Sequence, residues 1–93
     1  MARPRRLDEA ALAAELARTP GWERQGQAIR REFRWASFGE AMAFANRVAE
    51  LAERHDHHPD ILVQYSRVTL TLSTHDAGGL TELDFRLARE IGA

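Results

Sequence analysis

The chain has 93 residues, of which 13 are basic and 14 acidic, so its formal net charge is −1. A chain of this length builds one hydrophobic core, and a balanced charge without a long basic run argues against a nucleic-acid-binding domain. The sequence contains no cysteine and no lysine, which excludes disulfides, thiolate chemistry and Schiff-base catalysis. No segment approaches the roughly 20 apolar residues of a membrane-spanning helix. We therefore expect a single cytoplasmic domain over residues 1–93, with neither nucleic acid nor membrane as a partner.

Basic residues gather only at the N-terminus, where Arg3, Arg5 and Arg6 surround Pro4. Such a segment is far more often a solvated tail than a phosphate-binding site, so we expect residues 1–6 to be disordered. A domain this small buries only about 60–65% of the surface that its unfolded chain exposes. Association with further copies would therefore add stability.

The first part of the chain predicts a helix followed by two strands. Asp8 is a typical N-cap, and Thr19-Pro20-Gly21 ends the helix. A short extended segment follows over residues 22–25, and Gly26 allows a turn. Three apolar residues then alternate with charged ones, which is the pattern of a strand with one buried face: Ile29, Phe33 and Trp35.

The longest predicted helix begins at Ser37, which forms a capping-box pattern with Glu40. Phe44 and Leu51 lie roughly 100° outside its main apolar stripe. We expect these two side chains to contact a helix of another subunit, the alternative being that both are partly exposed. The stripe itself has spacings of three and four and is expected to pack on a sheet: Phe38, Ala41, Met42, Ala45, Val48, Ala49 and Ala52.

Two further strands and a last helix follow Pro59. Apolar and polar residues alternate over residues 61–65 and again over 68–72. Thr81 is the expected N-cap of the last helix, with Asp84 in a capping-box position. Leu83, Leu87 and Ile91 would form its inner face. The order α-β-β-α-β-β-α predicts an α+β fold, a four-stranded antiparallel sheet with helices packed on one face.

The histidines are the candidate chemical groups. His55, His57 and His58 are close in sequence, and His75 follows the clearest predicted strand. Imidazole transfers protons near neutral pH and is also the commonest metal ligand. Neighbouring histidines do not easily converge on one ion, so we favour acid–base catalysis without a metal. A helix end and a strand end can meet at one rim of a sheet, whereas His55 by itself is best interpreted as a surface residue.

The residues around these histidines resemble the signature of the pterin-4a-carbinolamine dehydratases. The resemblance includes the intervals: five residues separate Pro59 from Tyr65, nine follow before His75, and eight more precede Asp84. One departure is Ile61, where many members carry an aromatic residue, and this affects the pocket wall rather than the reaction. The matching segments cover nearly everything after the first helix: 20–22, 38–48, 53–59, 65, 73–81 and 84.

The resemblance implies dehydration of a 4a-hydroxytetrahydropterin to the quinonoid dihydropterin, which recycles the cofactor of aromatic amino acid hydroxylases. It also implies that His57 and His75 form the proton-transfer pair and that His58 positions the pterin. Such a reaction needs an acid and a base but no metal, redox cofactor or covalent intermediate, and positioned acid–base groups typically contribute about 10²–10⁴-fold.

Four further residues are candidate supporting groups on the same resemblance. Glu53 and Asp56 are expected to hold imidazole tautomers or contact the pterin edge. Asp84 is either a substrate-site residue or only a helix cap. Trp22 either stacks on the pterin ring or is a buried core residue.

Two other functions remain open at the level of the sequence. Some relatives in the family act as dimerisation partners of a transcription factor, so a non-catalytic binding module of coactivator type is one alternative. A pterin-modifying enzyme linked to molybdenum cofactor is another. The family also implies self-association, as a homodimer joined at sheet edges or a homotetramer that adds helix packing.

Overall fold

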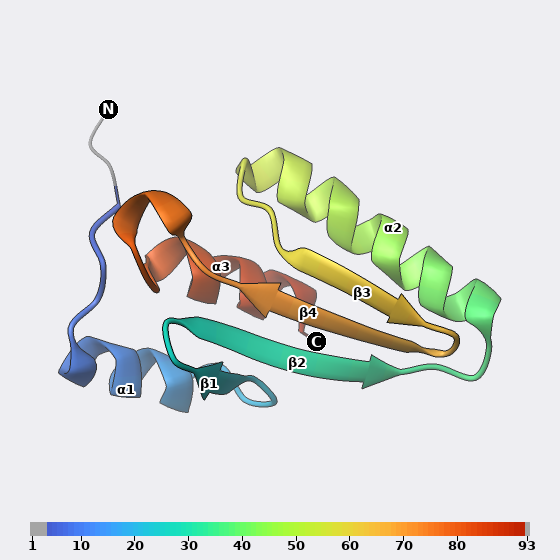
Figure 1. Cartoon of the computed structure of the whole chain (residues 1–93), viewed down its shortest axis with the longest axis horizontal. Helices are drawn as coiled ribbons and strands as arrows, with labels where there is room; N and C mark the ends of the chain where they lie inside the picture. Colours follow the sequence, from blue (N-terminus) through green and yellow to red (C-terminus); the bar gives the residue numbers. More distant parts are fainter. Residues whose placement is uncertain (1–3, 93) are drawn as a thin grey trace.

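The computed structural model describes residues 4–92, which form a four-stranded antiparallel sheet covered by helices (Figure 1). The predicted fold class and order of elements are confirmed, with one additional short 3₁₀ helix after the last strand. The elements in chain order are α1 (Glu9–Ala17), β1 (Glu23–Gln25), β2 (Ala28–Arg34), α2 (Phe38–His55), β3 (Asp60–Gln64), β4 (Arg67–Leu72), η1 (His75–Ala77) and α3 (Glu82–Ile91).

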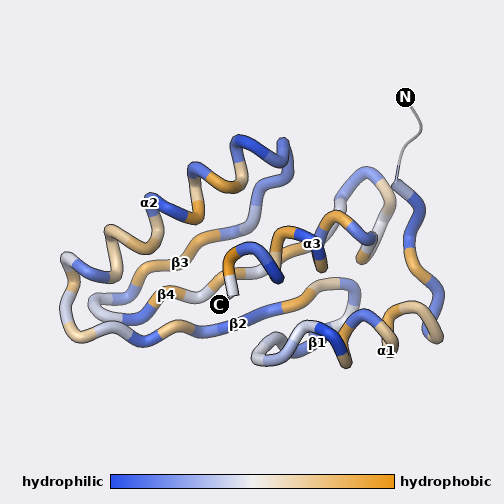
Figure 2. Tube along the Cα trace, turned by 180° about the vertical axis from the view of Figure 1, so that it is seen from behind, coloured by the Kyte–Doolittle hydropathy of each residue, from blue (hydrophilic) through white to orange (hydrophobic). Residues whose placement is uncertain are grey.

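The strands lie in the order β1-β2-β4-β3, so β2 and β4 are central and β1 and β3 are edges. Ile29 pairs with Leu72 and Phe33 with Val68, which places the apolar side chains of both central strands on the same face. Residues on alternate positions point to the opposite face, as the predicted period of two requires. The alternation of apolar and polar residues along these strands is visible in Figure 2.

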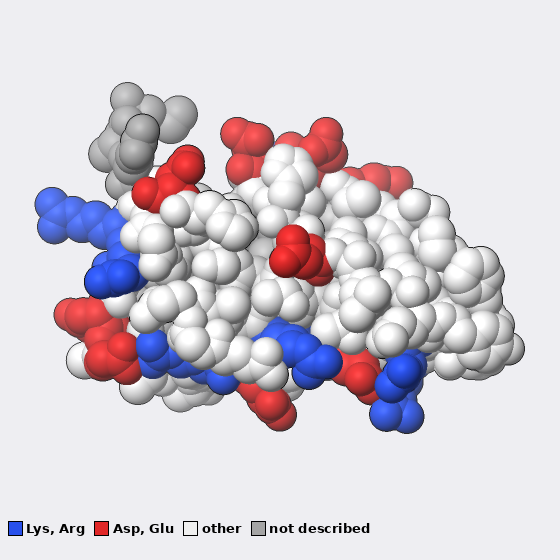
Figure 3. Space-filling view, viewed as in Figure 1, with Lys and Arg blue, Asp and Glu red and all other residues white. Residues whose placement is uncertain are grey.

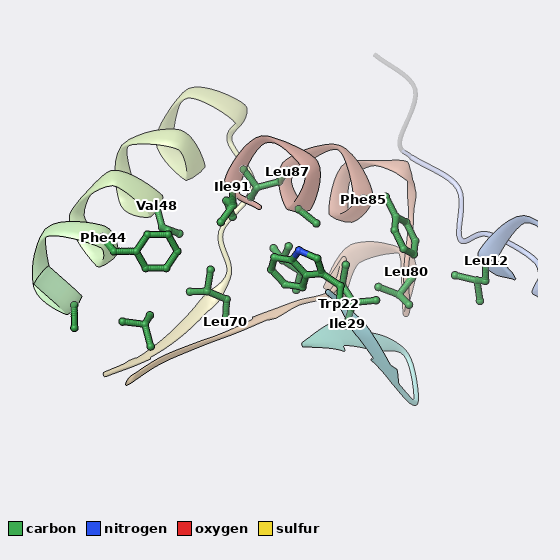
Figure 4. Close-up of a cluster of buried hydrophobic side chains, with 14 residues drawn as sticks. Leu12, Trp22, Ile29, Phe44, Val48, Leu70, Leu80, Phe85, Leu87 and Ile91 are labelled. Atoms are coloured by element: carbon green, nitrogen blue, oxygen red, sulfur yellow. The ribbon is translucent and has the colours of Figure 1, made fainter. Parts of the chain in front are cut away.

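The core lies between this apolar face and the helices α2 and α3 (Figure 4). Helix α1 joins it through Leu12 and contacts α3, where Arg89 donates hydrogen bonds to Glu15 and Thr19. The largest side chains with almost no exposed surface are Phe85, Leu12, Ile29, Leu70, Leu72, Leu80 and Leu87. Three helices therefore pack on one side of one sheet.

The apolar stripe of α2 differs from the predicted one. Phe44 is only 5% exposed and lies in the core of its own chain, and Leu51 packs partly buried against that core. The prediction that both contact another subunit is therefore wrong for Phe44. Phe38 and Met42, which were expected to face the sheet, are exposed. The physical reason is that α2 packs on both the sheet and α3, so its buried arc is wider and rotated relative to a single sheet contact.

Two local expectations also need correction. Tyr65 was predicted to continue the third strand, but β3 ends at Gln64 and Tyr65 occupies the hairpin turn with φ of 53° and 73% exposure. Part of the predicted tail, residues 1–3, lies outside the described residues, and Pro4 to Asp8 have no regular secondary structure. Within residues 4–92, no helix combines the length and the apolar character needed to cross a bilayer.

Candidate active site

The C-terminal end of α2 fixes the backbone that carries His57. Asp56 adopts a left-handed conformation with φ of 50°, which aspartate tolerates better than most residues. The Asp56 N–H donates to the carbonyl of Glu53, and the His57 N–H donates to the carbonyl of Ala52. These two bonds form a Schellman motif, so the helix ends at His55 and the chain reverses direction at the histidine pair.

His75 is held by a tight loop at the end of β4. Thr74 and Gly79 form an isolated antiparallel bridge, and each donates its N–H to the other's carbonyl. Within this loop, the N–H groups of Ala77 and Gly78 donate to the carbonyls of Thr74 and His75. Gly78 has φ of 72°, the left-handed region that glycine enters without strain. The backbone at His75 is therefore held in place by hydrogen bonds within its own loop.

These two segments meet at one pocket of about 230 Å³, which we call the histidine pocket. It lies where the end of α2 approaches the end of β4 and η1. These backbone segments are at the upper left of Figure 1. The three histidines singled out by the sequence all line it, although His75 is 17 residues beyond His58. The complete lining is Asp56, His57, His58, Ser73, Thr74, His75 and Asp76.

A buried carboxylate orients the imidazole of His57. Asp84 has no exposed surface, and its Oδ1 lies 2.6 Å from His57 Nε2. Its other oxygen, Oδ2, accepts hydrogen bonds from the Thr81 N–H and from the Thr74 hydroxyl, at 2.9 and 2.8 Å. An ionised carboxylate only accepts hydrogen bonds, so with Asp84 in that form the donor of this contact is His57 Nε2. Nδ1 is then the ring nitrogen of His57 that remains for other chemistry.

Of the two uses that the sequence left open for Asp84, the structure shows the helix cap. Asp84 does not itself line the histidine pocket, so a role toward a substrate stays a prediction. The capping box with Thr81 is complete, since the Thr81 hydroxyl also accepts a hydrogen bond from the Leu83 N–H. The same carboxylate reaches back to His57 through the interior. Thr74 was not predicted as a supporting residue, and the available signal was a hydroxyl residue directly before His75 at the end of an apolar strand.

His58 has a carboxylate partner of a different kind. Its Nε2 lies 2.5 Å from Glu53 Oε2, and both side chains are largely exposed. The expectation that Glu53 contacts an imidazole therefore matches this geometry. Asp56 lines the pocket but makes no side-chain hydrogen bond to a histidine within residues 4–92; its place is explained by the backbone turn.

The remaining predicted candidate, Trp22, lies away from the histidine pocket. Its indole is 6% exposed, belongs to the core and contacts Phe33 edge-on with ring centroids 6.2 Å apart. Of the two sequence alternatives for Trp22, the structure shows the buried core residue. His55, at the end of α2, does not line the pocket either. Residues 4–92 contain no cluster of three or more histidine or acidic side chains arranged to hold a metal ion.

Oriented imidazoles beside a small open pocket are suited to moving protons on and off a bound molecule. His57 has a buried carboxylate partner, whereas His58 and His75 are exposed to solvent. This arrangement, at one rim of the sheet of an α+β fold, defines a candidate site for acid–base chemistry without a nucleophilic thiol or lysine amine.

Comparison with known proteins gives the family. The sequence profile described as Pterin 4 alpha carbinolamine dehydratase matches residues 5–93. A protein of Thermomicrobium roseum named "Putative pterin-4-alpha-carbinolamine dehydratase" is 58% identical over 86 residues, which is 92% of each chain. One of the same name from Chloroflexus aurantiacus is 55% identical with the same coverage. The chain therefore belongs to the pterin-4a-carbinolamine dehydratase family.

Solved structures agree with this family and add two further descriptions. The crystal structure of a transcriptional coactivator/pterin dehydratase from Brucella melitensis superposes with a TM-score of 0.88 and 39% identity, covering 92% of this chain and 94% of the other. A pterin dehydratase-like protein described as a RuBisCO assembly factor in the alpha-carboxysome gives a TM-score of 0.65 and 26% identity, covering 76% and 84%. The fold is thus shared by proteins whose descriptions differ.

Proposed function

We propose that this chain dehydrates 4a-hydroxytetrahydropterins to quinonoid dihydropterins by histidine acid–base catalysis, and so recycles the cofactor of aromatic amino acid hydroxylases in the cytoplasm. The proposal is supported by membership of the family and by the histidine pocket. The single observation that carries it is that His57, His58 and His75 line one pocket although they come from two separate segments.

The reaction requires two proton movements. One acid protonates the hydroxyl on C4a so that it leaves as water, and one base removes a proton from the ring nitrogen system so that the adjoining C=N bond forms. His57 and His75 serve as this pair, one from each of the two segments that line the pocket. His58 contacts and positions the pterin, with Glu53 orienting its ring. Asp84 keeps the proton of His57 on Nε2, so that Nδ1 of His57 faces the reaction.

The test is direct measurement of carbinolamine dehydration with purified protein and its variants. We expect His57→Ala and His75→Ala each to lower the dehydration rate at least ~10-fold, because each removes one proton-transfer group. His55→Ala is the matched control, since this imidazole belongs to the same segment but lies outside the pocket. Circular dichroism of all three variants checks that the fold is kept.

Wild-type rates in both pocket variants would contradict the assignment of these two residues. A wild-type protein that does not exceed the uncatalysed rate would contradict the reaction itself. If the protein accelerates another pterin conversion instead, such as one linked to molybdenum cofactor, rates measured on several pterins will identify it.

We further propose that the chain forms a homodimer by pairing β3 edges. In the described residues β3 pairs only with β4, so its other side presents unpaired backbone groups. In Figure 3, the region over the β3–β4 turn and the start of α2 is largely free of charged side chains. The large apolar side chains that are exposed lie on α2, on β3 and in the turn between β3 and β4: Phe38, Met42, Ile61, Leu62 and Tyr65.

Light scattering tests the dimer. We expect Leu62→Glu to lower the measured mass to that of a monomer, because the charge would be buried against the partner. Gln25→Glu on β1 is the matched control, since it adds the same charge at the other sheet edge. A wild-type protein that stays monomeric at all concentrations, or an unchanged mass in Leu62→Glu, contradicts pairing through β3.

A binding module is the second candidate function, and the same apolar region favours it. The solved relatives described as a coactivator and as an assembly factor make a protein partner a real alternative to self-association. The dehydration assay separates the two functions, because a pure binding module leaves the uncatalysed rate unchanged.

A further inference from the structure

A second hollow lies between α2 and the C-terminal end of α3, next to the C-terminal end of β2. It encloses about 320 Å³ and shares no lining residue with the histidine pocket. Three of its lining side chains are aromatic: Phe33, Trp35 and Phe44. The ring of Phe44 lies 4.6 Å from that of Phe33 and 4.9 Å from that of Trp35, measured between centroids. Figure 4 shows Phe44 between α2 and the sheet. We call this hollow the aromatic groove.

Charged side chains of both signs line the same groove. Arg47, Glu50 and Arg54 project from α2 at spacings of three and four, which places them on one side of the helix, and Glu90 comes from α3. All four are exposed. None makes an ion pair within the part of the chain that the structure describes, although six arginine–carboxylate ion pairs form elsewhere in it.

Arg47 connects the charged and aromatic parts of the groove. Its guanidinium lies 5.6 Å from the ring centroid of Phe44 and 5.9 Å from that of Trp35. A guanidinium at this distance is attracted to the ring faces and keeps its outward N–H groups available. Arginine in this position binds a carboxylate through two parallel hydrogen bonds while it covers an aromatic ring beneath it.

From these features we propose that the aromatic groove binds a free amino acid with a single aromatic ring, in its zwitterionic form. The ring packs against the partly exposed side chains of Trp35 and Leu51, with the buried Phe44 behind Trp35. The carboxylate pairs with Arg47, and the ammonium group pairs with Glu50 or Glu90, the acidic residues at the rim of the groove. The volume is at the lower end of the roughly 300–1,000 Å³ typical of ligand pockets, which favours one ring over a larger molecule. Rim charges of both signs favour a ligand that carries both.

This inference does not depend on the dehydratase reaction, because the two hollows are separate. Loss of the histidines would leave the groove intact, and loss of groove charges would leave the histidine pocket intact. Failure of one proposal is therefore distinguishable from failure of the other.

Tryptophan fluorescence provides the binding assay. The chain has two tryptophans, so Trp22→Phe leaves Trp35 as the only indole, inside the groove. We expect L-phenylalanine to change this fluorescence saturably and calorimetry on the wild type to give the same dissociation constant. Phenylacetate, phenethylamine and L-leucine each lack one recognised group and are expected to bind at least ~10-fold more weakly.

Substitution at the rim locates the site. Arg47→Gln is expected to weaken L-phenylalanine binding at least ~10-fold, and Arg47→Lys to restore part of it, because lysine keeps the charge but not the paired hydrogen bonds. His57→Ala is the matched control and should bind as the wild type does. The proposal is overturned if millimolar L-phenylalanine gives no saturable change, if L-leucine binds equally well, or if Arg47→Gln binds unchanged.

Discussion

The histidine pocket and the aromatic groove both use α2, but they are built in opposite ways. In the histidine pocket, His57 and His58 each have a carboxylate within hydrogen-bonding distance, and one of these carboxylates is fully buried. In the aromatic groove, the rings contact one another while the four surrounding charges have no ion-pair partner in residues 4–92. A site for proton transfer needs fixed tautomers, whereas a site for binding needs shape and unused charge.

Among substitutions that test this difference between the two sites, Asp84→Asn is expected to have the largest effect on the dehydration rate. The Thr81 N–H and the Thr74 hydroxyl both need an acceptor, so the amide oxygen should take the place of Oδ2 and its NH₂ group should face His57. His57 Nε2 would then have to accept, and its proton would move to Nδ1. We expect the dehydration rate to fall at least ~10-fold, as for other catalytic histidines that lose their carboxylate partner.

The control for Asp84→Asn is L-phenylalanine binding, which should stay unchanged because Asp84 is not part of the groove. Urea denaturation should show a loss of about 1–3 kcal/mol in the free energy of unfolding, since a buried charge-assisted hydrogen bond is replaced. A dehydration rate at the wild-type level would show that the tautomer of His57 does not matter.

Glu53→Gln makes the corresponding change at the exposed pair and should have a smaller effect. Both Glu53 and His58 are largely exposed, so water can replace the lost hydrogen bond and the ring of His58 is less strictly held. We expect a fall of less than ~10-fold in the dehydration rate, mainly through a higher KM, because in the proposed mechanism His58 positions the substrate. A loss equal to that of Asp84→Asn would mean that burial of the carboxylate is not what distinguishes the two histidines.

Much of the fold was predictable because local signals agree with the final packing. Ser37, Thr81 and Asp8 cap their helices as expected, and the alternation along β2 and β4 matches the register. The buried arc of α2 was not predictable, because it depends on where α3 lies. Phe44 moves from an expected subunit contact to the core for that reason alone.

The residues of the candidate site also divide into those that local sequence signals predict and those that only the packing reveals. Sequence reasoning selected the three pocket histidines and Glu53, because residue type and position at element ends are local properties. It expected Glu53 and Asp56, both near the histidines in sequence, to hold imidazole tautomers or contact the pterin edge, whereas the carboxylate that reaches His57 is Asp84, 27 residues away. Trp22 was a candidate because its ring could stack on a pterin, and only the packing shows it in the core.

The two tryptophans allow a smaller test in and near the groove. The indole N–H groups of Trp22 and Trp35 are buried without a hydrogen-bond partner among the described residues. Trp35→Phe removes such a donor and some apolar surface together, so the two effects offset each other. We expect the free energy of unfolding to change by less than about 1 kcal/mol in urea denaturation, against about 3–5 kcal/mol for truncation of a buried aromatic to alanine. A loss above about 2 kcal/mol would indicate that the N–H has an acceptor in solution.

The smallest expected effect on stability comes from an ion pair that lies away from both the histidine pocket and the aromatic groove. This pair shows how much an exposed contact, such as that of Glu53 with His58, contributes. Arg24 on β1 donates two hydrogen bonds to Glu9 on α1, at 2.7 and 3.0 Å. These bonds, and then the charge of Arg24, hold the pKa of Glu9 below its ordinary value. The pair therefore stabilises the fold above the ordinary glutamate pKa, and this contribution is lost as the pH falls through the lowered one.

Arg24→Gln should return the pKa of Glu9 to its ordinary value in an NMR titration of the side-chain carboxyl. The wild type should be slightly more stable than this variant at neutral pH, and the difference should disappear in acid and shrink in high salt, because Glu9 is exposed. A Glu9 that titrates normally in the wild type at low salt would contradict the contact. If the exposed pair of Arg24 and Glu9 adds little stability, then a charge by itself orders an exposed side chain only weakly. The ring of His57 would then be held in place because its partner Asp84 is buried as well as charged.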